Sequence, residues 1–158
     1  MRDALIRLNP EIAEQPDRAE EVLYRLRAIP LSVASDGLVR ANETFAAWLR
    51  NEKTMPFGPG NEHTPVRLID YDAIGTDDDA NEYIVTNQWT FKPSPTGQVE
   101  KRFDVVLLVN GLPLVIGEAK TPVRPAVTWV DGAIQIGDDY ERNVPQMFAA
   151  NVFSFATE

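Results

Sequence analysis

One stretch constrains the fold of this chain more than any other: residues 101–122 read KRFDVVLLVNGLPLVIGEAKTP. Two apolar runs flank an Asn-Gly pair, which is the strongest short-range signal for a β-hairpin. Runs this apolar indicate buried strands rather than strands with one solvent face. Charged residues nevertheless stand at the open end of the hairpin, because the first run begins at Asp104 and the second closes on Glu118 and Lys120.

The register of the hairpin decides whether these charges meet. Glu118 and Lys120 are two residues apart, so both project to the same face of their strand. A regular two-residue turn places Asp104 opposite Gly117, and Glu118 then points to the other face. A three-residue turn or a β-bulge changes this parity and sets Asp104 against Glu118. We predict such a shift, since bulges are frequent beside active sites and Pro113 and Gly117 fit poorly in a regular ladder.

Two carboxylates and an amine at the end of a buried hairpin indicate a metal site. Close anions are unfavourable in a low-dielectric environment unless a cation joins them. Mg²⁺ prefers hard oxygen ligands, so Asp104, Glu118 and the carbonyl of Ala119 are candidate ligands. Such a metal polarises a phosphate and activates water, while Lys120 orients or helps to deprotonate that water, or neutralises charge on the phosphate. The expected reaction is phosphodiester hydrolysis; the alternative is that these are ordinary surface charges.

The rest of the chain predicts one α/β domain with a central mixed β-sheet flanked by helices. An N-terminal surface helix is expected within residues 1–17. Further helical segments are expected where apolar residues recur at helical spacing: residues 16–29, 38–50 and 126–142, with one helical turn over 145–149. Besides the hairpin, strands are expected where β-branched and aromatic residues cluster: residues 66–71, 83–91 and 152–155. Residues 51–65 and 75–82 are expected to be loops.

Composition excludes several classes of site. The chain has no cysteine and one histidine, His63, which argues against thiolate or multi-histidine zinc sites and against a Ser-His-Asp triad. A net charge of −9 is unfavourable for a general nucleic-acid-binding domain. No run approaches the length of a membrane-spanning helix, and the N-terminus lacks a signal-peptide core. We therefore expect a cytoplasmic protein without membrane contact.

The hairpin also resembles a known motif. FDVVLLVNGLPLVIGEAKTP is similar to the nuclease motif of the PD-(D/E)xK superfamily, and more closely to the N-terminal endonuclease domain of the R subunit of type I restriction enzymes. The VNGLPLV turn before ExK is the most specific element of this resemblance. NEYIVTNQWTF resembles the preceding strand of that family, and QIGDDYERNVPQMFAANVFSFATE resembles its following helix and strand. One departure is Phe103, which stands where the superfamily has proline.

The resemblance implies a restriction-endonuclease-like core and specific roles for site residues. Asp104 and Glu118 would be metal ligands, Lys120 the catalytic lysine, and Mg²⁺ the cofactor, with Mn²⁺ as a substitute. An acidic residue on the first helix often completes such sites, which leaves Glu20 and Glu21 as alternatives.

The family also carries a Gln and a Tyr on the helix after ExK, and Gln135 and Tyr140 match them by type. Their spacing is five residues instead of four. We expect either a helix bulge near Gly137 or a Tyr140 that only packs.

The function implied is that of a magnesium-dependent endonuclease domain acting on double-stranded DNA, in a restriction complex with methylation and specificity subunits. The chain has no GxxxxGK[ST] loop, so ATP would act only through a motor region outside it. Residues 1–158 are therefore expected to be a single nuclease domain of a longer polypeptide. Five cations are expected to form a basic rim around the acidic site: Lys92, Lys101, Arg102, Lys120 and Arg124. The alternatives are a repair or mobile-element nuclease of the same superfamily, or a non-catalytic docking domain.

Overall fold

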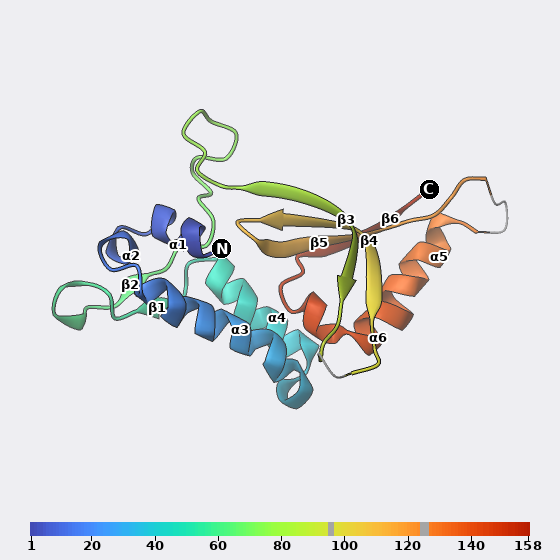
Figure 1. The fold of residues 1–158 in the computed structure, drawn as a ribbon, viewed down its shortest axis with the longest axis horizontal. Helices are drawn as coiled ribbons and strands as arrows, with labels where there is room; N and C mark the ends of the chain where they lie inside the picture. The colour runs from blue at the N-terminus through green and yellow to red at the C-terminus, as the bar shows by residue number, and fades with distance from the viewer. Residues whose placement is uncertain (95–96, 124–126) are drawn as a thin grey trace.

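The computed structural model describes residues 1–94, 97–123 and 127–158 as a mixed α/β fold (Figure 1). The helices are α1 (Arg2–Leu8), α2 (Pro10–Glu14), α3 (Arg18–Asp36), α4 (Leu38–Leu49), α5 (Trp129–Ile134) and α6 (Glu141–Asn143). The strands are β1 (Thr54–Met55), β2 (Thr64–Pro65), β3 (Tyr83–Phe91), β4 (Lys101–Val109), β5 (Leu112–Ala119) and β6 (Phe153–Thr157). Three tighter or wider helical segments complete the list: η1 (Pro59–Asn61), η2 (Gln135–Tyr140) and η3 (Pro145–Phe148).

The sheet has the predicted mixed character. Four strands lie in the order β3-β4-β5-β6, and a separate small ribbon joins β1 to β2. The β3–β4 and β4–β5 pairs are antiparallel, whereas β5 and β6 run parallel. Helices α1 to α4 gather near the turn of the β4–β5 hairpin, and α5 lies at its open end (Figure 1). The expected α/β class with a central mixed sheet flanked by helices is confirmed.

The hairpin contains the predicted bulge. Its two-residue turn, Asn110 and Gly111, has φ of 53° and 82°, as a type I′ turn requires. The pairing then shifts by one residue, so that Leu114 is the extra residue of β5. Beyond the shift Val105 pairs with Gly117, and the next position outward sets Asp104 opposite Glu118. Asp104 and Glu118 therefore stand opposite each other, as we predicted from the charged residues at the open end of the hairpin.

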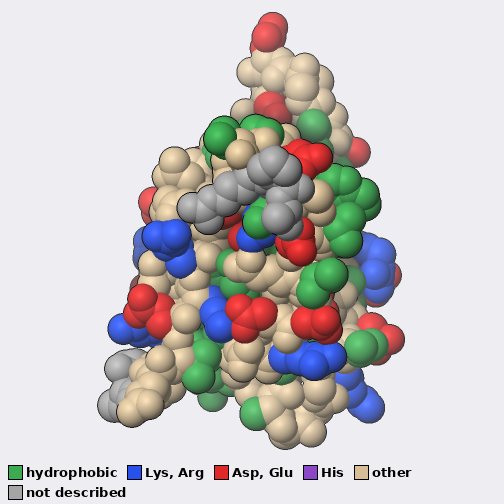
Figure 2. Space-filling model, turned by 90° about the vertical axis from the view of Figure 1, so that its right-hand side faces the viewer, with side chains coloured by type: hydrophobic (Ala, Val, Ile, Leu, Met, Phe, Trp, Pro, Cys, Tyr) green, Lys and Arg blue, Asp and Glu red, His purple; other side chains and the backbone are tan. Residues whose placement is uncertain are grey.

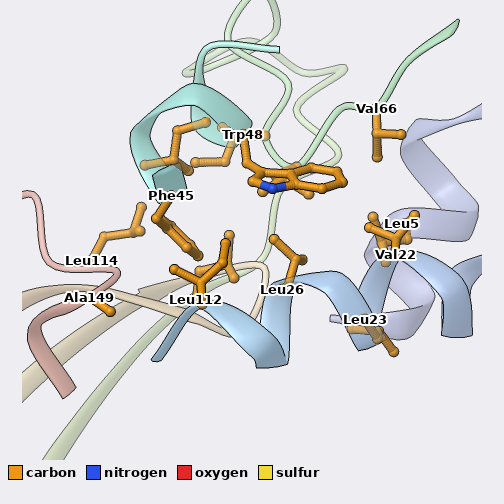
Figure 3. Packing of buried hydrophobic residues seen from close by; sticks show 14 of the residues in the cluster. Leu5, Val22, Leu23, Leu26, Phe45, Trp48, Val66, Leu112, Leu114 and Ala149 are labelled. Carbon is orange, nitrogen blue, oxygen red and sulfur yellow. The ribbon is translucent and has the colours of Figure 1, made fainter. Parts of the chain in front are cut away.

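Two hydrophobic cores hold the sheet. The first joins α1, α3 and α4 to the hairpin turn, with Trp48, Phe45 and Leu26 packed beside Leu112 (Figure 3). The second lies between the hairpin strands and the C-terminal helical segments. It consists of Phe103, Val106, Leu108, Ile116, Ile136, Tyr140, Val144, Met147 and Phe148. Because the rings of Phe103 and Tyr140 meet edge to face with centroids 4.8 Å apart, this core fixes η2 against β4 next to Asp104.

One helix is longer than its sequence predicts. The helical spacing predicts a helix over residues 16–29, but α3 begins at Arg18 and continues through Pro30 to Asp36. A proline inside a helix removes one backbone hydrogen bond and does not by itself prevent the next turn. Ile29 and Val33 are both buried in the first core, so packing on either side of Pro30 outweighs the lost bond.

The predicted strand over residues 66–71 is wrong, as this segment belongs to no sheet. Val66, Leu68 and Ile69 are buried as a strand pattern would suggest. The backbone of Arg67, however, is satisfied by a side chain: its N–H donates to Asn9 Oδ1 at 2.7 Å, and Asn9 Nδ2 donates to its carbonyl at 2.9 Å. The Asn9 amide thus replaces a neighbouring strand. The loop predicted over residues 51–65 likewise contains the short β1–β2 ribbon.

The C-terminal segments agree more closely with the elements predicted from the sequence. In place of one helix over residues 126–142, α5, η2 and α6 follow one another without a break, and Ala126 lies outside the described residues. The helical turn expected over 145–149 is η3, and the final strand is β6. Across the described ranges, no helix is long and apolar enough to cross a membrane.

Candidate active site

The bulged hairpin positions two carboxylates at its open end. Asp104 lies on β4 and is half-buried, while Glu118 lies on β5 and is only 4 % exposed. Asp104 Oδ2 accepts a hydrogen bond from the backbone N–H of Ala119 at 3.0 Å. A carboxylate as buried as that of Glu118 needs a cation or strong donors around it.

Lys120 supplies the positive charge. Its Nζ donates to Glu118 Oε1 at 2.7 Å, and it also donates to Gln135 Oε1. The Lys120 backbone N–H donates to Thr157 of β6 at 2.8 Å, which extends the parallel ladder and fixes the lysine on the same face as Glu118. An ammonium has three donors, and these two contacts use two of them.

The helix after the hairpin brings Gln135 and Tyr140 into the same network. Gln135 Nε2 donates to the Tyr140 hydroxyl at 2.5 Å, and that hydroxyl lies 3.1 Å from Glu118 Oε2 and 3.0 Å from the carbonyl oxygen of Arg102. Its single proton serves one of these two acceptors at a time. The Gln135 amide therefore bridges Lys120 and Tyr140, with its oxygen toward the ammonium and its nitrogen toward the hydroxyl.

A π-helical turn makes this contact possible. Residues five apart on an α-helix face different directions, whereas the wider π turn returns residue i+5 toward the face of residue i. The segment η2, from Gln135 to Tyr140, is such a turn. Of the two alternatives that the sequence left open, the helix bulge near Gly137 is thus confirmed. π-bulges are rare in proteins overall, but many of those that occur lie at functional sites.

Burial and charge raise the pKa of the Tyr140 hydroxyl well above that of a free tyrosine. Burial is the largest cause, followed by the negative charge of Glu118, the hydrogen bond to Glu118 and the charge of Asp104. The hydroxyl therefore stays protonated throughout the neutral range and serves as a donor. Since Asp104 stands opposite Glu118 across the hairpin, the two carboxylates project from the same face of the sheet.

Helix α5 approaches the site closely at a glycine. Gly132 is buried, and a Cβ built on it would lie 3.2 Å from Ala156 Cβ, 3.4 Å from Glu118 Cγ and 3.6 Å from Lys120 Cε. Upstream, Asp131 Oδ2 accepts from the Thr128 N–H at 2.7 Å and so caps the helix. A larger residue at Gly132 would push α5 away from the carboxylate and the lysine.

The structure does not bring Glu20 or Glu21 into this cluster. Both lie in the first turn of α3, beside α1 and α2 and on the side of the hairpin turn (Figure 1). Glu20 Oε1 is 3.2 Å from Arg2 Nε, and Glu21 lines a separate surface hollow with Arg18. The apolar stripe of α3 correctly predicts which face of the helix is buried. The direction of the helix, however, places its first turn far from the open end of the hairpin.

The open end of the hairpin offers a small set of oxygen atoms as candidate metal ligands. Within the described ranges, no three His, Cys, Asp or Glu side chains converge on one point. The candidate ligands are instead the two carboxylates and one carbonyl, as the sequence indicated. The N–H and C=O of a strand residue point to the same side, so the Ala119 carbonyl is directed, like its N–H, toward Asp104. With Lys120, the cluster carries a net charge of −1, which a divalent cation reverses.

The expected basic rim is largely neutralised. Three of its lysines are paired with carboxylates: Lys92 with Glu100 at 2.6 Å, Lys101 with Asp139 at 2.6 Å and Lys120 with Glu118 at 2.7 Å. Arg102 is exposed, and Arg124 lies outside the described residues. Among the described residues, the face that carries α5 shows acidic and basic side chains interspersed, without a continuous basic surface (Figure 2).

Sequence reasoning missed one residue of the site. Gln88 lies on β3 opposite Asp104, and its Nε2 donates to Asp104 Oδ1 at 3.1 Å. The residue stands within the NEYIVTNQWTF segment, but nothing in its alternation pattern distinguishes it from a solvent-facing strand residue. Only its backbone conformation, with a φ of 54°, sets it apart.

Comparison with known protein sequences identifies a family. A sequence model of the family described as "Type I restriction enzyme R protein N terminus (HSDR_N)" matches residues 1–158. The chain is 29% identical over 154 residues to the type I restriction enzyme HindI endonuclease subunit of Haemophilus influenzae (strain ATCC 51907 / DSM 11121 / KW20 / Rd). That match covers 96% of this chain and 13% of the relative, so the chain spans a small part of the relative's length. No solved structure matches the chain.

Proposed function

This chain belongs to the family of type I restriction enzyme R protein N termini, and from that premise we propose that it is a magnesium-dependent nuclease domain that hydrolyses phosphodiester bonds of duplex DNA. A restriction-endonuclease-like core is part of the proposal. One observation carries it: the Lys120 ammonium lies 2.7 Å from the buried Glu118 carboxylate, at the end of a bulged hairpin that sets Asp104 opposite.

Asp104, Glu118 and the Ala119 carbonyl would hold Mg²⁺, or Mn²⁺ in its place. When bound, the ion neutralises charge on the scissile phosphate and lowers the pKa of a coordinated water. Both Asp104 oxygens and both Glu118 oxygens already accept one hydrogen bond, and each keeps a lone pair for a cation. The carboxylates are thus oriented before any ion arrives, which lowers the cost of ordering them on binding.

Lys120 would act on the phosphate or on the attacking water. Two of its three donors are held by Glu118 and Gln135, so the third has a restricted direction. A fixed ammonium beside a phosphate stabilises negative charge as it develops on the phosphoryl oxygens. The same group can hold the water in line for attack. Both roles need the lysine in place, which the Gln135 amide secures.

Gln135 and Tyr140 would hold the site together without touching the phosphate. Tyr140 reaches Glu118 Oε2 and the Arg102 carbonyl, so it joins β4, β5 and η2. Because its pKa is raised, the hydroxyl keeps its proton at neutral pH. The Gln135 amide contacts both the Tyr140 hydroxyl and the Lys120 ammonium, and so links Lys120 to this anchor. Loss of either residue would loosen Glu118 and Lys120 relative to each other.

The charge of the chain fits a domain that partners deliver to DNA. A net charge of −9 with paired surface lysines gives little non-specific attraction to a polyanion. We propose that methylation and specificity subunits of a restriction complex place the domain on its substrate. ATP would act through a motor region outside this chain. Sequence choice would then belong to the partners, and the domain itself would cut without it.

A docking role is the second candidate. Exposed apolar side chains surround a surface hollow of about 420 Å³ on the sheet, among them Val85, Val152 and Phe153. Such a surface is typical of a contact between domains or subunits. Docking alone, however, has no use for the paired carboxylates and lysine at the other end of β5. The remaining rival, a repair or mobile-element nuclease of the same superfamily, would share the chemistry but not the partners.

The decisive test is cleavage by the assembled restriction complex. The R subunit would carry Glu118→Gln, Lys120→Met or, as a matched control, Glu141→Gln on the exposed α6. We expect both site variants to lose DNA cleavage by at least about a thousandfold, comparable to the loss of a catalytic group, while complex assembly is unchanged. Cleavage retained in Glu118→Gln would reject the nuclease role, and lost assembly with it would favour docking.

A further inference from the structure

Strand β3 is interrupted at one residue. Its register with β4 is constant from the Tyr83–Val109 pair to the Phe91–Lys101 pair, with no residue inserted on either strand. Gln88 and Asp104 are nevertheless missing from the ladder, although the pairs on both sides of them form. Gln88 has φ of 54°, in the left-handed region. Both strands change direction partway along their length in Figure 1.

A left-handed glutamine in a strand is unusual. Non-glycine residues rarely adopt this conformation, and asparagine, aspartate and glycine take it more readily than glutamine. Residues in such conformations persist when their surroundings hold them there, and they gather at functional sites. A chain that needed only a bend at this point would be served by glycine. The side chain of Gln88 is therefore the part of this residue that needs an explanation.

The side chain reaches the candidate metal ligand across the interrupted ladder. Gln88 Nε2 donates to Asp104 Oδ1 at 3.1 Å, while Asp104 Oδ2 accepts from the Ala119 N–H at 3.0 Å. The two donors come from the strands on either side of β4 and hold the two oxygens of one carboxylate. Lys120 pairs with Glu118 rather than with Asp104. Gln88 is thus a donor that orients Asp104 without neutralising its charge.

We infer that Gln88 is a positioning residue, whose amide fixes the Asp104 carboxylate for cation binding at the end of the hairpin. This inference rests on the nuclease function proposed above. A neutral donor suits the role better than a second lysine, because it leaves the negative charge of Asp104 available to the ion. Partners that orient metal ligands in this way typically change metal affinity by ten- to a hundredfold when removed.

The test is a Mn²⁺ titration of the 158-residue chain followed by paramagnetic broadening of NMR signals. Gln88→Gly keeps the left-handed backbone without strain and removes the amide. Gln88→Met keeps the length of the side chain and removes only the donor. We expect both variants to bind Mn²⁺ about tenfold more weakly than the wild type. Without metal, Asp104→Asn should shift the side-chain NH₂ signal of Gln88 relative to its position in the wild type.

Asn61→Gly is the matched control, since Asn61 is another left-handed amide residue, with φ of 65°, in the distant η1 turn. Its Mn²⁺ affinity should equal that of the wild type. Unchanged affinity in Gln88→Gly, or affinity retained in Gln88→Met, would overturn the positioning role while leaving the metal site intact. A wild type that binds no Mn²⁺ even with a short DNA duplex present would instead reject the proposed function, and the Gln88–Asp104 bond would still be judged by the NH₂ signal.

Discussion

The hydroxyl of Tyr140 lies 3.1 Å from Oε2 of Glu118, and so connects the π-helical turn to the buried end of β5. This contact crosses from a helix to a strand 22 residues earlier in the chain. It has a consequence for stability at alkaline pH, because it raises the pKa of Tyr140 together with burial.

The first prediction concerns Tyr140→Phe. A raised pKa in the folded state contributes stability that is fully present below the pKa of the unfolded tyrosine, about 10, and is lost as the pH rises through the folded value. The free energy of unfolding of the wild type should thus fall more steeply above about pH 10 than that of Tyr140→Phe. Near neutral pH the variant should be less stable by about 1–3 kcal/mol, from the lost hydrogen bonds.

Urea unfolding of both proteins from neutral to strongly alkaline pH measures this difference. The pKa values of Tyr71 and Tyr83 are also raised, but these residues are present in both proteins and cancel in the comparison. Parallel stability curves for the two proteins would show that Tyr140 does not titrate as the structure implies.

The second prediction concerns the Glu118–Lys120 pair. Lys120→Met leaves the buried Glu118 carboxylate without its cation and should destabilise the chain by about 3 kcal/mol. Glu118→Gln should cost less, about 1–2 kcal/mol, because Lys120 is more exposed and keeps its bond to Gln135. Together the two changes should cost less than the sum of the single ones by about 1–2 kcal/mol. Chemical denaturation of the four proteins gives this coupling, and strict additivity would mean that the pair is not formed.

The third prediction concerns Asn110 in the hairpin turn. This residue is fully buried; its Oδ1 accepts from the Glu82 N–H at 2.9 Å, and its Nδ2 donates to the Leu68 carbonyl and to Asn81 Oδ1, both at 2.9 Å. Asn110→Gly keeps the left-handed turn but removes these side-chain hydrogen bonds, so we expect the free energy of unfolding to fall by about 3 kcal/mol. Asn61→Gly, at an exposed left-handed position, should change stability by less than about 0.5 kcal/mol. Equal effects of the two substitutions would show that the Asn110 bonds contribute nothing.

The fourth prediction concerns Gly117, which pairs with Phe155 in the parallel ladder. A Cβ built on Gly117 would lie 2.4 Å from Cζ of the Phe155 ring. Gly117→Ala should therefore destabilise the chain by about 1–3 kcal/mol through overpacking, and a second change, Phe155→Leu, should recover part of that loss. By contrast, Gly137→Ala meets nothing within 4 Å and should be neutral or stabilising. Thermal unfolding distinguishes these cases. A Gly117→Ala variant as stable as the wild type would contradict the close contact between Gly117 and the Phe155 ring.

Sequence alone predicted the parts of the site that are local to the chain. The Asn-Gly turn and the apolar runs gave the hairpin, and the charges at its open end required the bulge that Leu114 provides. The five-residue step from Gln135 to Tyr140 left a bulge or a packing role open, and the π turn decides between them. In each case the information lies in residues close together in sequence.

The parts that sequence did not give depend on distant contacts. The strand expected over residues 66–71 is replaced by an irregular segment, in which the Asn9 amide, 58 residues away in sequence, satisfies the backbone of Arg67. Helical periodicity identified the buried face of α3 but not where its first turn lies, so Glu20 and Glu21 could not be assigned. The role of Gln88 follows from a backbone angle that no residue pattern encodes.

The most direct test of the central claim is a Mn²⁺ titration of the wild-type chain and of Asp104→Ala, with paramagnetic NMR broadening to locate the ion. Glu21→Ala changes an acidic residue remote from the open end of the hairpin; it serves as the control and should bind as the wild type does. We expect binding in the wild type, with broadening centred on Asp104, Glu118 and Ala119, and its loss in Asp104→Ala. Binding that survives in Asp104→Ala, or no binding at millimolar Mn²⁺ even with a short DNA duplex present, would contradict the account.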